Sequence, residues 1–172
     1  MRSKFAIAGH PLHPMLVAIP VGLFAWTFVS DLVYLAQDKD HMWYSIAFWT
    51  GIAAVVSGLV AALPGLGDFL TMARKADARE IAIAHMGLNV ANVALFFLAM
   101  LLMLDDGAID GGRLTAVVVM HGVGLALLLP AGWLGGEMVF RHHLAVVADS
   151  GELEVEEGRL HQRAGSVRSA HR

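Results

Sequence analysis

The uneven distribution of charged residues is the feature that most limits how this chain can fold. Four windows, 14–37, 43–66, 81–104 and 114–140, contain 99 of the 172 residues but only two of the 27 Asp, Glu, Lys and Arg residues, Asp31 and Glu137. A helix that faces water needs a polar face, and these windows have none. The sequence therefore excludes a soluble globular domain.

Each of the four windows is long enough to cross a lipid bilayer as a helix. A hydrocarbon core of about 30 Å requires about 20 apolar residues in an α-helix, whose backbone hydrogen bonds are all satisfied within the segment. The alternating ten-residue strands of a transmembrane barrel are absent from the sequence. We therefore predict an all-α, integral membrane four-helix bundle over residues 1–147, followed by a polar, partly disordered tail over 148–172. No internal repeat is evident from the sequence.

The basic residues predict the orientation of this bundle. Of the 12 Lys and Arg residues, ten lie before the first window, between the second and third, or after the fourth. The other two, Lys39 and Arg113, lie in the two remaining loops. Because loops rich in Lys and Arg stay in the cytoplasm, we expect both termini to be cytoplasmic.

Composition and motifs also exclude several kinds of chemistry. The chain has no cysteine, so it forms no disulfide and supplies no thiolate ligand to haem or to an iron–sulfur cluster. Its net charge of −3 gives no indication of nucleic-acid binding. We find no serine–histidine–acid spacing, phosphate loop or zinc-protease motif, so a stand-alone enzyme is not expected.

Polar residues at membrane depth are the candidate functional residues, because burying them in a bilayer is costly. At about 1.5 Å of rise per residue, they form two clusters. The outer cluster contains Asp31, His41 and His121. Asp31 and His121 could form a proton-active pair or a satisfied buried pair, and we expect the latter. The cluster near the cytoplasmic side contains His10, His13, Asp68, His85, Asn89, Glu137, Arg141, His142 and His143.

Histidines of the cytoplasmic cluster are suited to bind a cofactor. Pro11 and Pro14 stiffen the segment that carries His10 and His13, and His85 lies at a matching depth. Imidazoles from facing helices of a bundle can ligate the iron of a b-type haem. The predicted ligands are His13 and His85, with His10 or His142 as substitutes.

Two other interpretations of the same residues remain open. His85, Asn89 and Asn92 share one helix face, so they could form the hydrogen bonds that hold the bundle together. Alternatively, a metal ion could be held by His10, His13, His85, Asp68 and Glu137. In the fourth window we expect Gly132 and Gly136 to permit a close helix contact, and Glu137 to pair with Arg141.

Three motifs carry a resemblance to a known family. The segments GHPLHPMLVAIPVGLF at 9–24, AHMGLN at 84–89 and GGEMVFRHH at 135–143 resemble the bacterial membrane family catalogued as domain of unknown function 2231. The resemblance covers about residues 5–147, although His143-Leu144 departs from the small residues usual there. Some members of that family are joined to Rieske iron–sulfur domains, which implies an electron-transfer setting. Any such cluster would belong to a partner, since this chain has no cysteine.

These observations together predict a membrane-embedded electron-transfer or redox-accessory protein of the bacterial inner membrane, with b-type haem as its cofactor. A Rieske-type or other redox protein, or a larger membrane complex, is the expected partner. The alternatives are a non-catalytic structural subunit of such a complex and a metal-binding membrane protein.

Overall fold

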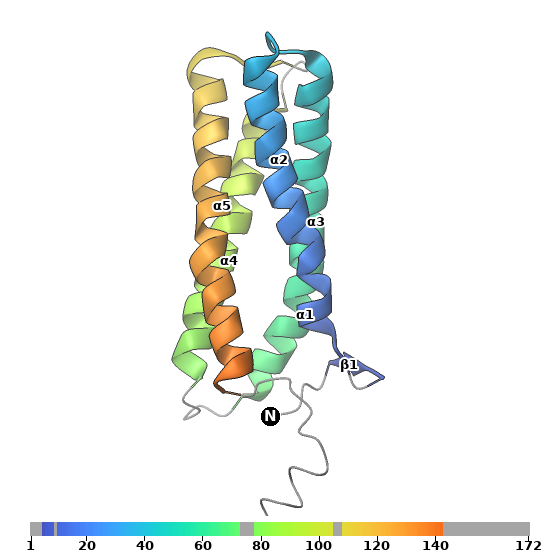
Figure 1. The fold of residues 1–172 in the computed structure, drawn as a ribbon, viewed down its shortest axis with the longest axis vertical. Helices are drawn as coiled ribbons and strands as arrows, with labels where there is room; N and C mark the ends of the chain where they lie inside the picture. Colours follow the sequence, from blue (N-terminus) through green and yellow to red (C-terminus); the bar gives the residue numbers. More distant parts are fainter. Residues whose placement is uncertain (1–4, 9, 73–77, 105–107, 143–172) are drawn as a thin grey trace, which may run out of the picture.

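The fold is known from a computed structural model, which describes residues 5–8, 10–72, 78–104 and 108–142 (Figure 1). A short antiparallel hairpin comes first, with β1 at Ala6–Ile7 and β2 at His10–Pro11. The helices then follow in the order α1 (Leu12–Leu16), α2 (Ala18–Ala36), α3 (His41–Thr71), α4 (Arg79–Leu102) and α5 (Gly111–Phe140).

Four helical segments of the described chain are long and apolar enough to cross a membrane. The first joins α1 and α2 over Leu12–Ala36, and the other three are α3, α4 and α5, with lengths of 25, 31, 24 and 30 residues. The predicted all-α, four-spanning fold is therefore confirmed. The helix α3 ends at Thr71, five residues beyond the predicted window. His143 and the predicted tail lie outside the described residues, and the orientation in the membrane stays a prediction.

A break at Val17 separates α1 from α2. Pro20 has no backbone N–H to donate to the carbonyl of Leu16, so one bond of a continuous helix cannot form there. Pro20 instead occupies the first turn of α2, where an N–H group would have no partner within that helix. The break leaves His13 on the short α1, at the lower end of the bundle in Figure 1.

The bundle consists of two helical hairpins, α1–α3 and α4–α5, whose sequences and burial correspond. The segments 13–24 and 85–96 align without a gap and share His, Leu, Val, Leu and Phe, at His13/His85, Leu16/Leu88, Val21/Val93, Leu23/Leu95 and Phe24/Phe96. The buried positions Pro20, Phe24, Thr27 and Asp31 correspond to Asn92, Phe96, Ala99 and Met103.

The second helices of the two hairpins correspond equally well. Buried residues of α3 match buried residues of α5 at a constant offset of 70, in the pairs Tyr44/Leu114, Ala47/Val117, Gly51/His121, Ala54/Gly124 and Ala61/Ala131. The expectation of no internal repeat is therefore wrong. The repeat was missed in the sequence because few of the corresponding side chains are identical. The two hairpins therefore place their buried residues at corresponding positions.

Large buried side chains lie mainly in one half of the bundle. We call the upper half the part above the contact between Phe24 and Phe96, whose ring centroids are 4.5 Å apart, and the lower half the part that contains α1 and the start of α4 (Figure 1). A cluster in the upper half contains Tyr34, Tyr44, Ala47, Ala99, Met100, Met103, Ile109, Leu114 and Val117.

Close helix contacts use other glycines than the sequence suggested. A Cβ atom on Gly132 would meet no other atom within 4 Å, and one on Gly136 would meet only Phe140 of the same helix. The expected contact through these two glycines is therefore wrong within this chain. A Cβ atom on Gly124 would instead lie 2.8 Å from the ring of Phe96, so α5 approaches α4 most closely at Gly124.

Candidate functional site

Two histidines, one from each hairpin, meet in the lower half. The ring centroids of His13 on α1 and His85 on α4 are 6.2 Å apart, and the ring planes are nearly perpendicular at 88°. Both side chains are partly buried. The matching depth that we predicted for these two residues is therefore confirmed, and their positions correspond in the two halves of the repeat.

Each of the two rings is fixed by the same hydrogen bond to the second helix of its own hairpin. Nδ1 of His13 donates to the carbonyl oxygen of Ala61, and Nδ1 of His85 donates to that of Ala131, both at 2.8 Å. A carbonyl can only accept, so these bonds place the proton on Nδ1 and leave a lone pair on Nε2. Both rings therefore present a basic nitrogen on the side opposite the anchoring bond.

A glycine lies beside each anchored ring, one turn after the accepting alanine. A Cβ atom on Gly65 would lie 2.8 Å from Nδ1 of His13, and one on Gly135 would lie 3.3 Å from Cε1 of His85. Any larger residue at Gly65 would therefore displace the ring of His13. The repeat thus conserves a three-part arrangement of histidine, carbonyl and glycine in both hairpins.

Asn89 distinguishes the two histidines. Its Nδ2 donates to the carbonyl oxygen of His85 at 2.8 Å and lies 3.3 Å from Nε2 of the same residue. The corresponding residue of the first hairpin is Val17, which has no polar side chain. The lone pair of His85 Nε2 therefore faces a weak donor, as expected for the tautomer that its bond to Ala131 requires.

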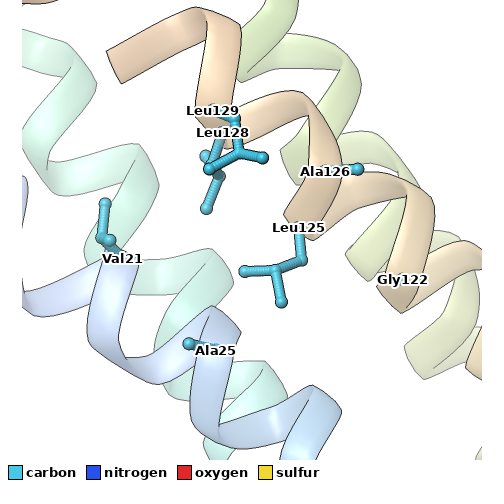
Figure 2. Close-up of a pocket in the computed structure, with 7 residues that line it drawn as sticks. All are labelled: Val21, Ala25, Gly122, Leu125, Ala126, Leu128 and Leu129. Carbon is cyan, nitrogen blue, oxygen red and sulfur yellow. The ribbon is translucent and has the colours of Figure 1, made fainter. Parts of the chain in front are cut away.

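Small and apolar side chains surround the histidine pair. Among the described residues, the buried apolar side chains of the lower half are alanines and prolines, namely Ala61, Ala78, Ala82, Ala131, Pro20 and Pro64. An apolar groove with a volume of about 490 Å³ lies above the pair, where α2 faces α5 (Figure 2). Its lining residues are Val21, Ala25, Gly122, Leu125, Ala126, Leu128 and Leu129. The seam between the hairpins is therefore apolar on this side.

The other predicted ligands lie apart from this pair or have other contacts. His10 is exposed, and its Nδ1 donates to the carbonyl oxygen of Ala8 in the same turn. Glu137 accepts a hydrogen bond from Arg141 at 2.7 Å, which confirms the predicted ion pair. Asp68 and His142 are partly buried near the lower ends of α3 and α5. The described part of the chain contains no group of three His, Cys, Asp or Glu side chains placed to hold a metal ion.

The predicted pair of Asp31 and His121 forms in the upper half. Nδ1 of His121 donates to Oδ2 of Asp31 at 2.6 Å, and the exposed fractions of the two side chains are 0% and 3%. Nε2 of His121 and both amide atoms of Asn92 are buried without a hydrogen-bond partner among the described residues. The pair is therefore present as predicted but only partly satisfied.

Sequence reasoning missed the residues that hold the two lower histidines. The carbonyl groups of Ala61 and Ala131 and the adjacent Gly65 and Gly135 carry no chemical signal of their own. One signal was available in the sequence. An Ala is followed four residues later by a Gly in both 44–65 and 114–135, and these two Ala–Gly pairs are separated by the same 70 positions as the other matches between the two segments.

Comparison with known proteins agrees with this architecture. No curated protein and no solved structure matches the chain. One family model does match, over residues 9–148, and its description is "Predicted membrane protein (DUF2231)". The match includes all of α1–α5, and the chain therefore belongs to the DUF2231 family of predicted membrane proteins.

Proposed function

We propose that the protein binds one b-type haem between His13 and His85 and transfers electrons within the membrane. The observation that carries this proposal is the spacing of the two anchored rings. Their centroids are 6.2 Å apart, and the rings belong to opposite hairpins.

This spacing suits two axial ligands of one iron. Bonds between a metal and an imidazole nitrogen are about 2.0 Å long, so two rings on opposite sides of one metal have centroids about 6 Å apart. The ring planes of His13 and His85 are nearly perpendicular at 88°.

The hydrogen bonds at Nδ1 support the same proposal. A histidine that ligates a metal through Nε2 nearly always donates its other N–H to a carbonyl or carboxylate, which fixes the ring and raises its basicity. His13 and His85 both have this bond before any ligand is considered. The carbonyl groups of Ala61 and Ala131 thus act as the outer shell of the proposed site.

The donor set suits haem better than a bare metal ion. A structural zinc site usually has four protein ligands, and a catalytic site has three. Each hairpin supplies one histidine at a corresponding position, and the described residues offer no third ligand beside them. Haem needs only two axial ligands from the protein, and its porphyrin prefers apolar surroundings such as the alanines of the lower half.

A bound haem would supply one-electron redox chemistry, while the chain would hold the iron, exclude water and set its potential through the two histidines. The electron donor or acceptor in this proposal is a Rieske-type or other redox protein, or a larger membrane complex. We place the protein in the inner membrane of a bacterium, with both termini in the cytoplasm.

A structural role is the second candidate, and one observation favours it. Each bond from a histidine to a carbonyl already links two helices of one hairpin, as in bundles that polar residues hold together. This role does not explain why the two rings, one from each hairpin, lie side by side in the lower half. The protein would then be a non-catalytic subunit of a larger complex.

The visible spectrum of the detergent-purified protein, before and after dithionite, tests these roles against each other. Haem binding predicts a Soret band, α and β bands that sharpen on reduction, and one haem per chain. A colourless protein with one metal ion per chain would favour the metal-binding alternative instead. A colourless and metal-free protein that also fails to bind added haemin would contradict the proposal and leave the structural role.

A further inference from the structure

We propose that Asp31 and His121 form a second functional site, a buried proton-binding site whose acceptor is Nε2 of His121. This inference is independent of haem binding, because it concerns the other half of the bundle. The ligand is a proton delivered by a water molecule.

The geometry of the pair leaves one nitrogen available. The 2.6 Å bond to Asp31 keeps a proton on Nδ1 of His121, so Nε2 carries the lone pair in the neutral ring. That nitrogen is fully buried and has no partner among the described residues. A proton added at Nε2 would form one N–H bond and leave an imidazolium paired with the carboxylate of Asp31, with no electron transferred.

The repeat shows that this layer can be packed without ionisable groups. Each member of the pair has an equivalent in the other hairpin. Met103 corresponds to Asp31, and Gly51 corresponds to His121. The side chain of Met100 fills the space beside Gly51, with its sulfur 2.6 Å from where a Cβ atom would lie. The same molecule therefore fills the equivalent position with apolar side chains. For this reason packing alone does not account for an Asp–His pair inside the membrane.

A second group of unsatisfied polar atoms lies about one helical turn below the pair. The amide of Asn92 is 1% exposed, and neither its nitrogen nor its oxygen has a partner among the described residues. Its Oδ1 lies beside Gly124, which is one turn from His121 along α5. Buried water molecules bind where otherwise unsatisfied polar groups occur together, so a water held by Asn92 would be the proton carrier in this proposal.

The surroundings favour an imidazolium only through Asp31 and an aromatic face. The ring of His121 stacks on Phe96 with centroids 4.3 Å apart and planes 21° apart, and an aromatic face attracts a cation. The other buried titratable side chains are Tyr34 and Tyr44, whose hydroxyl groups donate to the carbonyl oxygens of Ile109 and Met103. Asp31 is therefore the one buried carboxylate of the described core that can balance the added charge.

Nitrogen NMR of the ¹⁵N-histidine-labelled full chain in lipid nanodiscs tests this inference. The signals of His121 are assigned as those that disappear in H121Q. We expect both ring nitrogens to change from the neutral to the doubly protonated form as the pH is lowered. In D31N the ring should stay neutral over the same range, because the imidazolium would lose the carboxylate that balances its charge.

The control variant is H41Q, which removes a histidine that is exposed at the upper end of the bundle and should leave the His121 signals unchanged. A wild-type ring that stays neutral at every pH at which the protein is folded would overturn the inference. A protonation step that D31N leaves unaltered would also overturn it. The wild-type titration decides the question even if D31N does not fold.

Discussion

The upper and lower halves of the bundle are built by the same two hairpins and differ in what fills them. The upper half contains large side chains such as Tyr34, Met100 and Val117, each at most 5% exposed. The lower half contains buried alanines and prolines and two histidines that are only partly buried. This difference supports our proposal that the lower half holds a ligand, whereas large packed side chains fill the upper half.

The halves also differ in their symmetry. Around the anchored rings of the lower half both hairpins have the same residues, with His13 and His85, Ala61 and Ala131, and Gly65 and Gly135. In the upper half the corresponding residues have diverged. Asp31 of the first hairpin pairs with His121 of the second, whereas the equivalent positions, Met103 and Gly51, have no ionisable group. In our proposals the ligand is held by equal contributions from the two hairpins, whereas the proton site uses a different residue from each.

The largest expected effect comes from removing one member of the upper pair. D31A or H121A leaves a buried polar partner unpaired, so we expect a loss of about 3–5 kcal/mol in the free energy of unfolding. The double variant D31M/H121G introduces the residues of the other hairpin and should lose much less, since both partners are removed together. Reversible unfolding in detergent measures the free energy of unfolding of all three variants. If the loss in the double variant equals the sum of the two single losses, the two residues do not interact.

A glycine substitution gives the next effect and separates interior from lipid-facing positions. G124L forces a side chain against Phe96 and Asn92, and overpacking of this kind costs about 1–3 kcal/mol. G132L is the matched control on the same helix and should leave stability unchanged, because Gly132 has no neighbour within 4 Å. If G124L and G132L lose equal stability in thermal unfolding, the face of α5 that carries Gly132 is also in contact with other protein atoms.

The lower half should respond in ligand binding rather than in stability. G65A places a Cβ atom against the ring of His13, and we expect haem affinity to fall by about tenfold, which is about 1.4 kcal/mol. G135A should have a weaker effect, because its Cβ atom would be farther from His85. G22A is the control, since Gly22 has no neighbour within 4 Å. Haemin titrations that show no difference between G65A and G22A would contradict the anchored geometry.

Asn89 should have the smallest effect. N89V copies Val17 of the first hairpin and removes the donor that lies 3.3 Å from Nε2 of His85. Since a neutral hydrogen bond contributes about 0.5–1.5 kcal/mol, haem should bind a few-fold more tightly once this competitor is absent. A weaker affinity in N89V would show instead that Asn89 holds His85 in place.

The sequence was sufficient to predict the four spans and the matching depths of two pairs, His13 with His85 and Asp31 with His121. Charged residues mark the ends of the helices, and a constant rise per residue then places His13 beside His85 and Asp31 beside His121. The faces of the helices were harder to predict, because lipid is as apolar as a protein interior. Gly132 and Gly136 therefore looked like an interior pair although they face outward, while Gly65 and Gly135 had no distinguishing feature.

The internal repeat could be recognised only when burial was known. Corresponding positions such as Gly51 and His121, or Pro20 and Asn92, share a location in the fold but no chemistry. The main-chain carbonyls that anchor the lower histidines are likewise invisible in a sequence, since every residue has one.

Haem binding between His13 and His85 is the central claim, and the reduced-minus-oxidised spectrum of three variants tests it most directly. H13A and H85A should each abolish or strongly shift the haem bands, because each removes one axial ligand. H121Q should retain the wild-type spectrum, since His121 lies in the other half. Loss of the bands in H121Q, with an unchanged spectrum in H85A, would contradict the account and move the site to the upper half.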